Sequence, residues 1–126
     1  MSFKNDTFDL IICNHVLEHI TDDRTAMSEI YRVLKKGGLG ILQVPIDKDL
    51  EKTYEDKTLV SKKQRAKHFG QYDHVRIYGR DYKDRLENNG FIVNFIDYTR
   101  EIEDDLIYKY GLIQGELIPI VKKSIG

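Results

Sequence analysis

The stretch FDLIICNHVLEHITDDRTAMSEIYRVLKKGGLGILQVP, residues 8–45, decides the fold. It opens with a nearly continuous apolar run, FDLIICN, which is typical of a strand covered on both faces, as in a parallel sheet. Asp22 is a good N-cap, and the apolar residues that follow it recur at helical spacing. Those residues are Ala26, Met27, Ile30, Val33 and Leu34. Lys35 and Lys36 are expected in the last turn of this helix, which Gly37 ends.

A second apolar run, GILQVPI at residues 40–46, follows the helix and predicts another buried strand. Strand, helix and strand in this order predict a right-handed crossover between parallel strands, the unit of doubly wound α/β folds. Asp23, next to the N-cap, is expected to face solvent in the first turn, where a negative charge is favourable. The fold class is therefore α/β.

Further elements are predicted around this unit. Residues 47–78 are rich in charge and predict an excursion from the sheet, with a short helix in SKKQRAKHF at 61–69. A helix is expected over 79–90, packing through Tyr82 and Leu86. A third strand is expected over 91–97, another helix over 103–112 and a last strand over 116–123, where Pro119 favours a position with a free edge.

Length and composition limit the classes of protein. The 126 residues suit one domain, 1–126, and 20 basic against 21 acidic residues give a net charge of -1. Nucleic acid is therefore not an expected partner. Cys13 is the only cysteine, which excludes an intramolecular disulfide and fits the cytoplasm. No apolar run approaches the roughly 20 residues of a membrane helix, so no membrane contact is expected.

The quoted stretch closely resembles the second half of class I S-adenosylmethionine-dependent methyltransferases of the small-molecule type. The shared order is a strand, NHVLEH at its carboxyl end, a helix that ends in RVLKKGG, and a strand. HFGQYDHVRIYGRDYKDRLENNGF, residues 68–91, resembles a group of bacterial methyltransferases. The implied fold is a truncated Rossmann-like one, a mostly parallel sheet with an antiparallel last strand, without the strands that carry the family's glycine-rich cofactor loop. Cofactor binding by this chain is therefore expected to be impaired.

The resemblance implies roles at the carboxyl end of the first strand, where open α/β sheets bind ligands. The expected site residues are, for S-adenosylmethionine, Asn14, His15, Val16 and Leu17; for acid–base catalysis, His19 and His74; and for a small-molecule acceptor, Glu18, Asp73, Arg76 and Tyr78. Two simpler interpretations stay open. His19 may instead be read as a hydrogen-bond partner of local backbone, and Asp73 and Arg76 as an ion pair that ties the excursion to the sheet.

His15 to His19 also match H-x-x-E-H, which in some zinc peptidases places two ligands and a catalytic glutamate on one helix. The preceding buried strand argues against a long helix here, so no metal site is expected. The strand from Phe8 to Asn14 would lack its family neighbour, which predicts a homo-oligomer that covers it. A non-catalytic oligomerising module is thus the alternative to an enzyme.

Overall fold

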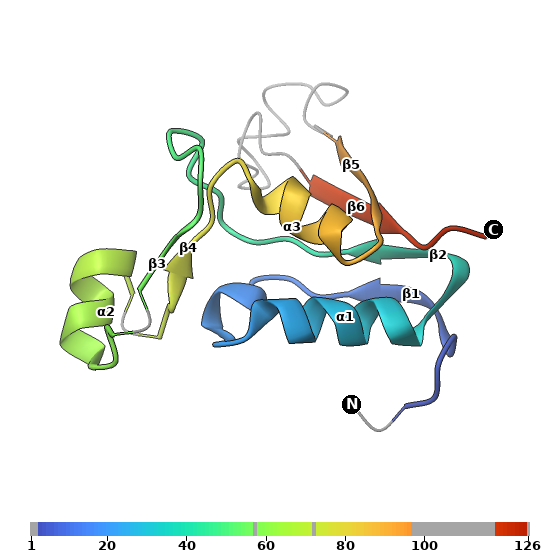
Figure 1. Ribbon diagram of the computed structural model, residues 1–126, viewed down its shortest axis with the longest axis horizontal. Helices are drawn as coiled ribbons and strands as arrows, with labels where there is room; N and C mark the ends of the chain where they lie inside the picture. The colour runs from blue at the N-terminus through green and yellow to red at the C-terminus, as the bar shows by residue number, and fades with distance from the viewer. Residues whose placement is uncertain (1–2, 57, 72, 97–117, 126) are drawn as a thin grey trace, which may run out of the picture.

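The computed structural model describes residues 3–56, 58–71, 73–96 and 118–125 of the chain (Figure 1). The elements in chain order are β1 (Phe8–Ile12), the 3-10 helix η1 (Leu17–His19), α1 (Asp23–Val33), β2 (Leu34–Ile41), β3 (Tyr54–Glu55), α2 (Lys62–Phe69), β4 (Arg76–Ile77), α3 (Tyr82–Asn88), β5 (Ile92–Ile96) and β6 (Ile118–Lys122). The predicted helix over 103–112 lies outside the described residues. None of the described helices is both long and apolar enough to cross a membrane.

The main sheet has the strand order β1-β2-β6-β5. β1 and β2 are parallel, whereas β6 is antiparallel to both of its neighbours, β2 and β5. Three of the described strands therefore run in one direction and the last strand in the chain runs against them. This confirms the predicted α/β fold with a mostly parallel sheet and an antiparallel last strand.

Helices α1 and α3 lie side by side against one face of this sheet (Figure 1), and Ser28 Oγ of α1 donates a hydrogen bond to Asn89 Oδ1 just after α3 at 2.7 Å. The apolar stripe predicted for α1 is the one that is buried, and Tyr82 and Leu86 of α3 have no exposed surface. Tyr82 also donates its hydroxyl to the carbonyl of Leu42 at 2.6 Å. The core thus lies between these two helices and the sheet.

The opposite face of the sheet is apolar and open. Leu10 and Ile12 of β1 are 55% and 60% exposed, and their neighbours on this face, Leu39 and Ile92, are 46% and 50% exposed. The pairing register places Leu10 beside Leu39, and both Leu39 and Ile92 opposite Lys122, so these side chains form one row across the sheet. The sequence predicted a first strand covered on both faces, but among the described residues only the α1 side is covered.

The predicted end of the first helix was also wrong. Asp22 is the N-cap, as expected, and its side chain accepts from Thr25 N at 3.1 Å. The helix nevertheless stops at Val33, so Lys35 and Lys36 belong to β2. The amide of Thr7 donates to the carbonyl of Val33 at 2.8 Å, and pairing with β1 thereby replaces the helical turn that the lysines favoured.

Pro119 does not lie in an edge strand, because β6 is paired on both sides. Its carbonyl accepts from Leu42 N at 3.3 Å, one residue beyond the end of β2 at Ile41. In an antiparallel pair the N–H and C=O of one residue point to the same neighbour, so the missing N–H of proline falls where the ladder to β2 is ending. Pro119 is thus accommodated at the end of a hydrogen-bond ladder and not, as expected, in a strand with a free edge.

Part of the charged excursion forms a small unit of its own. β3 and β4 pair as a separate two-stranded sheet, and α2 lies between them in the chain. Ser61 caps α2 in a capping box with Gln64, since each side chain bonds the other residue's backbone amide. The sequence therefore predicted both the departure from the main sheet and its short helix.

Candidate functional site

The carboxyl end of β1 turns sharply into η1. Beyond the strand, Cys13 N still donates to the carbonyl of Ile41, the last residue of β2, at 2.8 Å, and His15 N donates to that of Gln43 at 2.7 Å. His15 then adopts a positive φ of 55°, a conformation that few non-glycine residues adopt. Of the residues predicted to border the cofactor, Asn14, His15 and Val16 are exposed at this edge, whereas Leu17 is buried.

The H-x-x-E-H pattern does not form the helix that a zinc peptidase needs. His15 lies in the left-handed turn, and only residues 17–19 form the short η1. His15 and His19 therefore do not share a helical face, which removes the geometric basis of the peptidase interpretation. The chain turns at His15 because β1 ends shortly before it, at Ile12.

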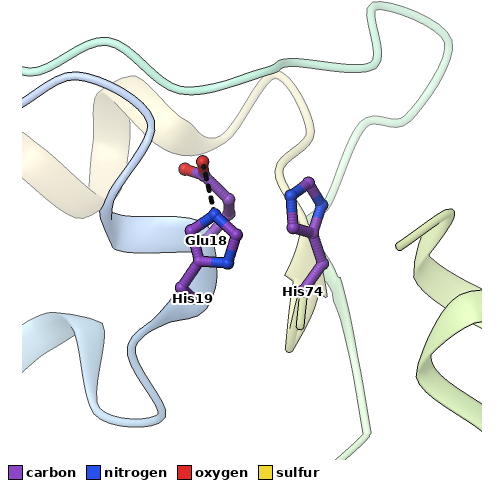
Figure 2. Close-up of side chains that lie close together, drawn as sticks. All are labelled: Glu18, His19 and His74. Atoms are coloured by element: carbon purple, nitrogen blue, oxygen red, sulfur yellow. Dashed lines mark ion pairs between the residues drawn. The ribbon is translucent and has the colours of Figure 1, made fainter. Parts of the chain in front are cut away.

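His19, Asp73 and His74 meet although 54 residues separate His19 from Asp73. Nδ1 of His19 lies 3.0 Å from the backbone oxygen of Asp73 and 3.3 Å from Oδ2 of the same residue. The rings of His19 and His74 meet edge to face, with centroids 4.6 Å apart. Figure 2 shows them facing one another, His19 from η1 and His74 from the segment before β4.

Glu18 lies on the protein side of this pair. Its residue is 2% exposed, its Oε1 lies 3.4 Å from His19 Nε2, and its backbone oxygen accepts from Val75 N at 2.9 Å. Within the described part of the chain, Oε2 of Glu18 is buried without a hydrogen-bond partner. A buried carboxylate oxygen without a partner is costly, so this atom is a candidate for contact with a ligand.

Arg76, in β4, links that strand to η1 through hydrogen bonds. Its guanidinium is 2% exposed and donates to three backbone oxygens around η1, those of Leu17, Ile20 and Thr21. Its Nε donates to Glu55 Oε2 at 2.9 Å, so Arg76 pairs with Glu55 and not with Asp73. One interpretation of the sequence was an Asp73–Arg76 ion pair that ties the excursion to the sheet. Glu55 belongs to the same excursion, so the contacts that link Arg76 to the rest of the chain are those with the three carbonyls and, at 3.7 Å, with Asp23 Oδ2.

A second arginine extends this network. Arg85 donates to Asp23 Oδ2 at 2.9 Å and to Glu55 Oε1 at 2.7 Å, and Tyr78 donates its hydroxyl to Asp23 Oδ2 at 2.6 Å. Tyr78 has no exposed surface. Burial, with the nearby Asp23 carboxylate, raises the pKa of the Tyr78 hydroxyl, so it acts as a donor throughout the physiological range. Tyr78 therefore belongs to the buried hydrogen-bond network of Arg85 and Asp23.

The arginines also determine the charge of Glu55. Its partial burial alone would raise the pKa of the carboxyl, but hydrogen bonds from Arg85 and Arg76 outweigh that effect and the pKa is lowered. Asp23 was expected to face solvent, yet it is 4% exposed. The outward prediction for Asp23 was wrong because the two arginines provide buried partners for its carboxylate.

Asp23, Glu55 and Arg85 are the members of the network that the sequence did not single out. One signal was available for Arg85: it stands three residues after Tyr82, and side chains at that spacing share a helix face. No comparable signal pointed to Glu55, which contacts residues distant in the sequence.

A pocket of 280 Å³ opens beside the cluster. Its lining includes Glu18 and His74, and it continues along Arg76, Pro45 and Phe69. Glu18, His74 and Arg76 are thus predicted site residues that line this pocket. The pocket is small, and of a size for part of a small molecule.

Comparison with known proteins relates the first third of the chain, which includes η1, to a family model. Residues 1–42 match the family model described as "Methyltransferase domain". A demethylmenaquinone methyltransferase of Streptomyces avermitilis is 47% identical over 38 residues, 30% of this chain and 16% of that protein. Matched curated relatives align over 31% and 16% of their own length, so the chain spans about a third of their length or less.

Solved structures share the fold at low identity. An S-adenosylmethionine-dependent methyltransferase of Mesorhizobium loti has a TM-score of 0.58 at 13% identity, covering 98% of this chain and 65% of that one. The [4+2]-cyclase SpnF has a TM-score of 0.62 at 14% identity, covering 100% of this chain and 54% of that one. The family match over residues 1–42 and this shared fold bear out the resemblance of the chain to the class I S-adenosylmethionine-dependent methyltransferases.

Proposed function

We propose that this chain contributes the acceptor side of a methyl-transfer site, in which S-adenosylmethionine donates a methyl group to a small molecule. The observation that supports this most directly is the location of NHVLEH, which lies at the carboxyl end of β1 inside the region that matches the methyltransferase model. Open α/β sheets bind their ligands at this edge. The exposed residues Asn14, His15 and Val16, followed by Leu17, would border the cofactor.

The two histidines would act on the acceptor. His19 is held against Asp73, and His74 lines the pocket, so an acceptor hydroxyl or amine there would meet an imidazole that can take up its proton. Methyl transfer is an in-line displacement at a sulfonium carbon, and it depends mostly on positioning. We therefore assign the histidines and Asp73 to orientation and proton transfer, and Arg76 and Tyr78 to support of the acceptor site.

A titration with S-adenosylmethionine, followed by amide chemical shifts in NMR, tests the cofactor half of this proposal. Shifts concentrated at residues 14–17, with weak affinity because the sequence has no glycine-rich loop between a strand and a helix, are the expected result. His68, exposed on α2, provides a control amide that should not move. Unchanged spectra at millimolar cofactor would instead favour the non-catalytic module.

The second candidate is that oligomerising module, with a second copy of this chain as the partner. It rests on a specific observation, the apolar row on the open sheet face together with β1 as the terminal strand of the described sheet. A pocket of 240 Å³ lined by Phe8, Leu10 and Ile30 among others adjoins that strand. Edge strands with apolar side chains pair readily with other chains.

Light scattering on the purified chain tests this candidate. A dimer or larger assembly is expected, and Leu10→Lys should shift it toward monomer, because a charge would then lie at the β1 end of the row, which is apolar up to Lys122. Asp9→Lys, an exposed change on the same strand, is the matched control and should leave the assembly intact. A wild-type chain that stays monomeric at high concentration would eliminate this candidate.

A further inference from the structure

Glu18, His19 and His74 bring a carboxylate and two imidazoles together at one point. One ligand atom from each residue lies within 4.8 Å of the others. We propose that these three side chains bind a divalent metal ion, with Zn²⁺ as the ion that suits the set best. This differs from the expectation drawn from the sequence alone, in which no metal was foreseen, and it does not depend on methyl transfer.

The first argument is the state of Glu18. The residue is 2% exposed, and its Oε2 has no hydrogen-bond partner in the described part of the chain. Its ion-pair contact is with His19, through Oε1 at 3.4 Å. A buried carboxylate that makes one long contact lacks the compensation that buried charges normally have, and a bound cation would supply it.

The second argument is the arrangement around His19. When Nδ1 carries the proton, it donates to the backbone oxygen of Asp73 at 3.0 Å and leaves the lone pair on Nε2. That Nε2 is the atom facing Glu18. Histidines that bind metals nearly always donate their other ring N–H to a carbonyl or carboxylate in this way, which fixes the ring and the tautomer.

The third argument concerns the geometry of the set. Two histidines and one carboxylate form a known three-ligand set for zinc, with a fourth position left open for water or substrate. Ligand atoms around one zinc lie roughly 3.3 Å apart, so small side-chain rotations would close the cluster around an ion. Glu18 and His74 both line the 280 Å³ pocket, and the open position would therefore face it.

His15 is the natural control because it belongs to the same sequence motif but not to the cluster. It is exposed, with a φ of 55°, and lies outside the group of ligand atoms. A site built on the linear H-x-x-E-H motif would need His15 and could dispense with His74. The proposed site needs His74 and could dispense with His15.

Zinc titration of the metal-free chain by calorimetry, with Co²⁺ absorption as a second readout, tests the proposal. One ion per chain should bind to the wild type and to His15→Asn, because asparagine tolerates the left-handed turn. Glu18→Gln and His74→Gln should each weaken binding by more than the roughly 10- to 100-fold that changes around a ligand set cost. Equal affinity in His74→Gln and the wild type, or loss of binding in His15→Asn alone, would overturn the proposal.

A measurement on the unaltered chain covers the case in which a variant does not fold. Diethyl pyrocarbonate modifies accessible imidazoles, and mass spectrometry reports each site. Zinc should protect His19 and His74 and leave His15 and His68 reactive. Equal modification of all four histidines with and without zinc would contradict the site, whichever reaction the protein catalyses.

Discussion

Replacing Arg76 by methionine should destabilise the fold more than any surface change, because its guanidinium is buried and satisfies several partners. It donates to the carbonyls of Leu17, Ile20 and Thr21 and to Glu55. Methionine retains much of the side-chain volume but none of the donors. The change therefore isolates the polar contacts from the packing.

The size of the effect follows from the burial of each partner. The Leu17 carbonyl is buried and would keep only the bond from Ile20 N at 3.3 Å, so losing its bond to the charged guanidinium costs about 1–3 kcal/mol. The other two carbonyls are partly accessible to water, and Glu55 keeps Arg85, so each adds about 0.5–1 kcal/mol. The sum of about 2.5–6 kcal/mol, with a midpoint of about 4 kcal/mol, spans the roughly 3–5 kcal/mol that breaking a buried ion pair usually costs.

Urea unfolding followed by circular dichroism measures this cost. With an m value of about 2 kcal/mol/M, a loss of about 4 kcal/mol lowers the midpoint by roughly 2 M. Arg80→Met is the matched control, since Arg80 is exposed, and it should change the free energy of unfolding by about 0.5 kcal/mol or less. A loss below about 1 kcal/mol for Arg76→Met would refute the reasoning.

Arg76→Lys separates charge from geometry. A lysine ammonium would keep a positive charge near Glu55, but it cannot donate at once to three carbonyls spread around η1. We expect it to recover only part of the loss. If lysine restored full stability, the ion pair alone would account for the effect and the carbonyl contacts would contribute nothing.

Three further predictions concern other parts of the chain. Ser61→Ala should cost about 1 kcal/mol in urea unfolding, because it removes the N-cap of α2. The pKa of Glu55 is lowered in the fold, so its stabilisation should be present above its ordinary value of 4.5 and disappear as the pH falls below it; Glu55→Gln should flatten this dependence in thermal melts. Burial, and secondarily Glu18, raises the pKa of the Cys13 thiol, so iodoacetamide at pH 8 should alkylate the native chain several-fold more slowly than the urea-unfolded chain, as mass spectrometry would show.

The pattern of neighbouring residues in the sequence was sufficient to predict a helix that packs through one stripe of apolar side chains. Helix α1 has an aspartate N-cap and apolar residues at helical spacing, and both signals act within a few residues of the chain. The short helix expected at 61–69 was found as well, and its Ser61–Gln64 capping box is equally local in sequence. The end of α1 depended instead on backbone bonds to residues that precede β1, and a helical stripe carries no information about them.

The site shows the same difference between features that are local in the sequence and contacts between distant residues. The resemblance singled out His19 and His74, but no spacing rule brings together rings that lie in segments so far apart in the chain. Arg76 was recognised as a charge that needs a partner, and the partner was misidentified because Asp73 is near in sequence whereas Glu55 is near in space. Pairing of buried charges is decided by tertiary packing, so sequence distance is a poor guide to it.

The contacts around η1 make the site more rigid than its position in a turn suggests. Arg76 bonds the carbonyls of Leu17 and Ile20, one on each side of Glu18 and His19, and Val75 N bonds the carbonyl of Glu18 itself. Because Val75 and Arg76 directly follow His74, the same short segment positions both halves of the cluster. A methyl acceptor or a metal ion would therefore meet side chains that are already oriented, which lowers the cost of binding. Substitutions of Arg76, which also lines the pocket, should therefore weaken the binding of either ligand.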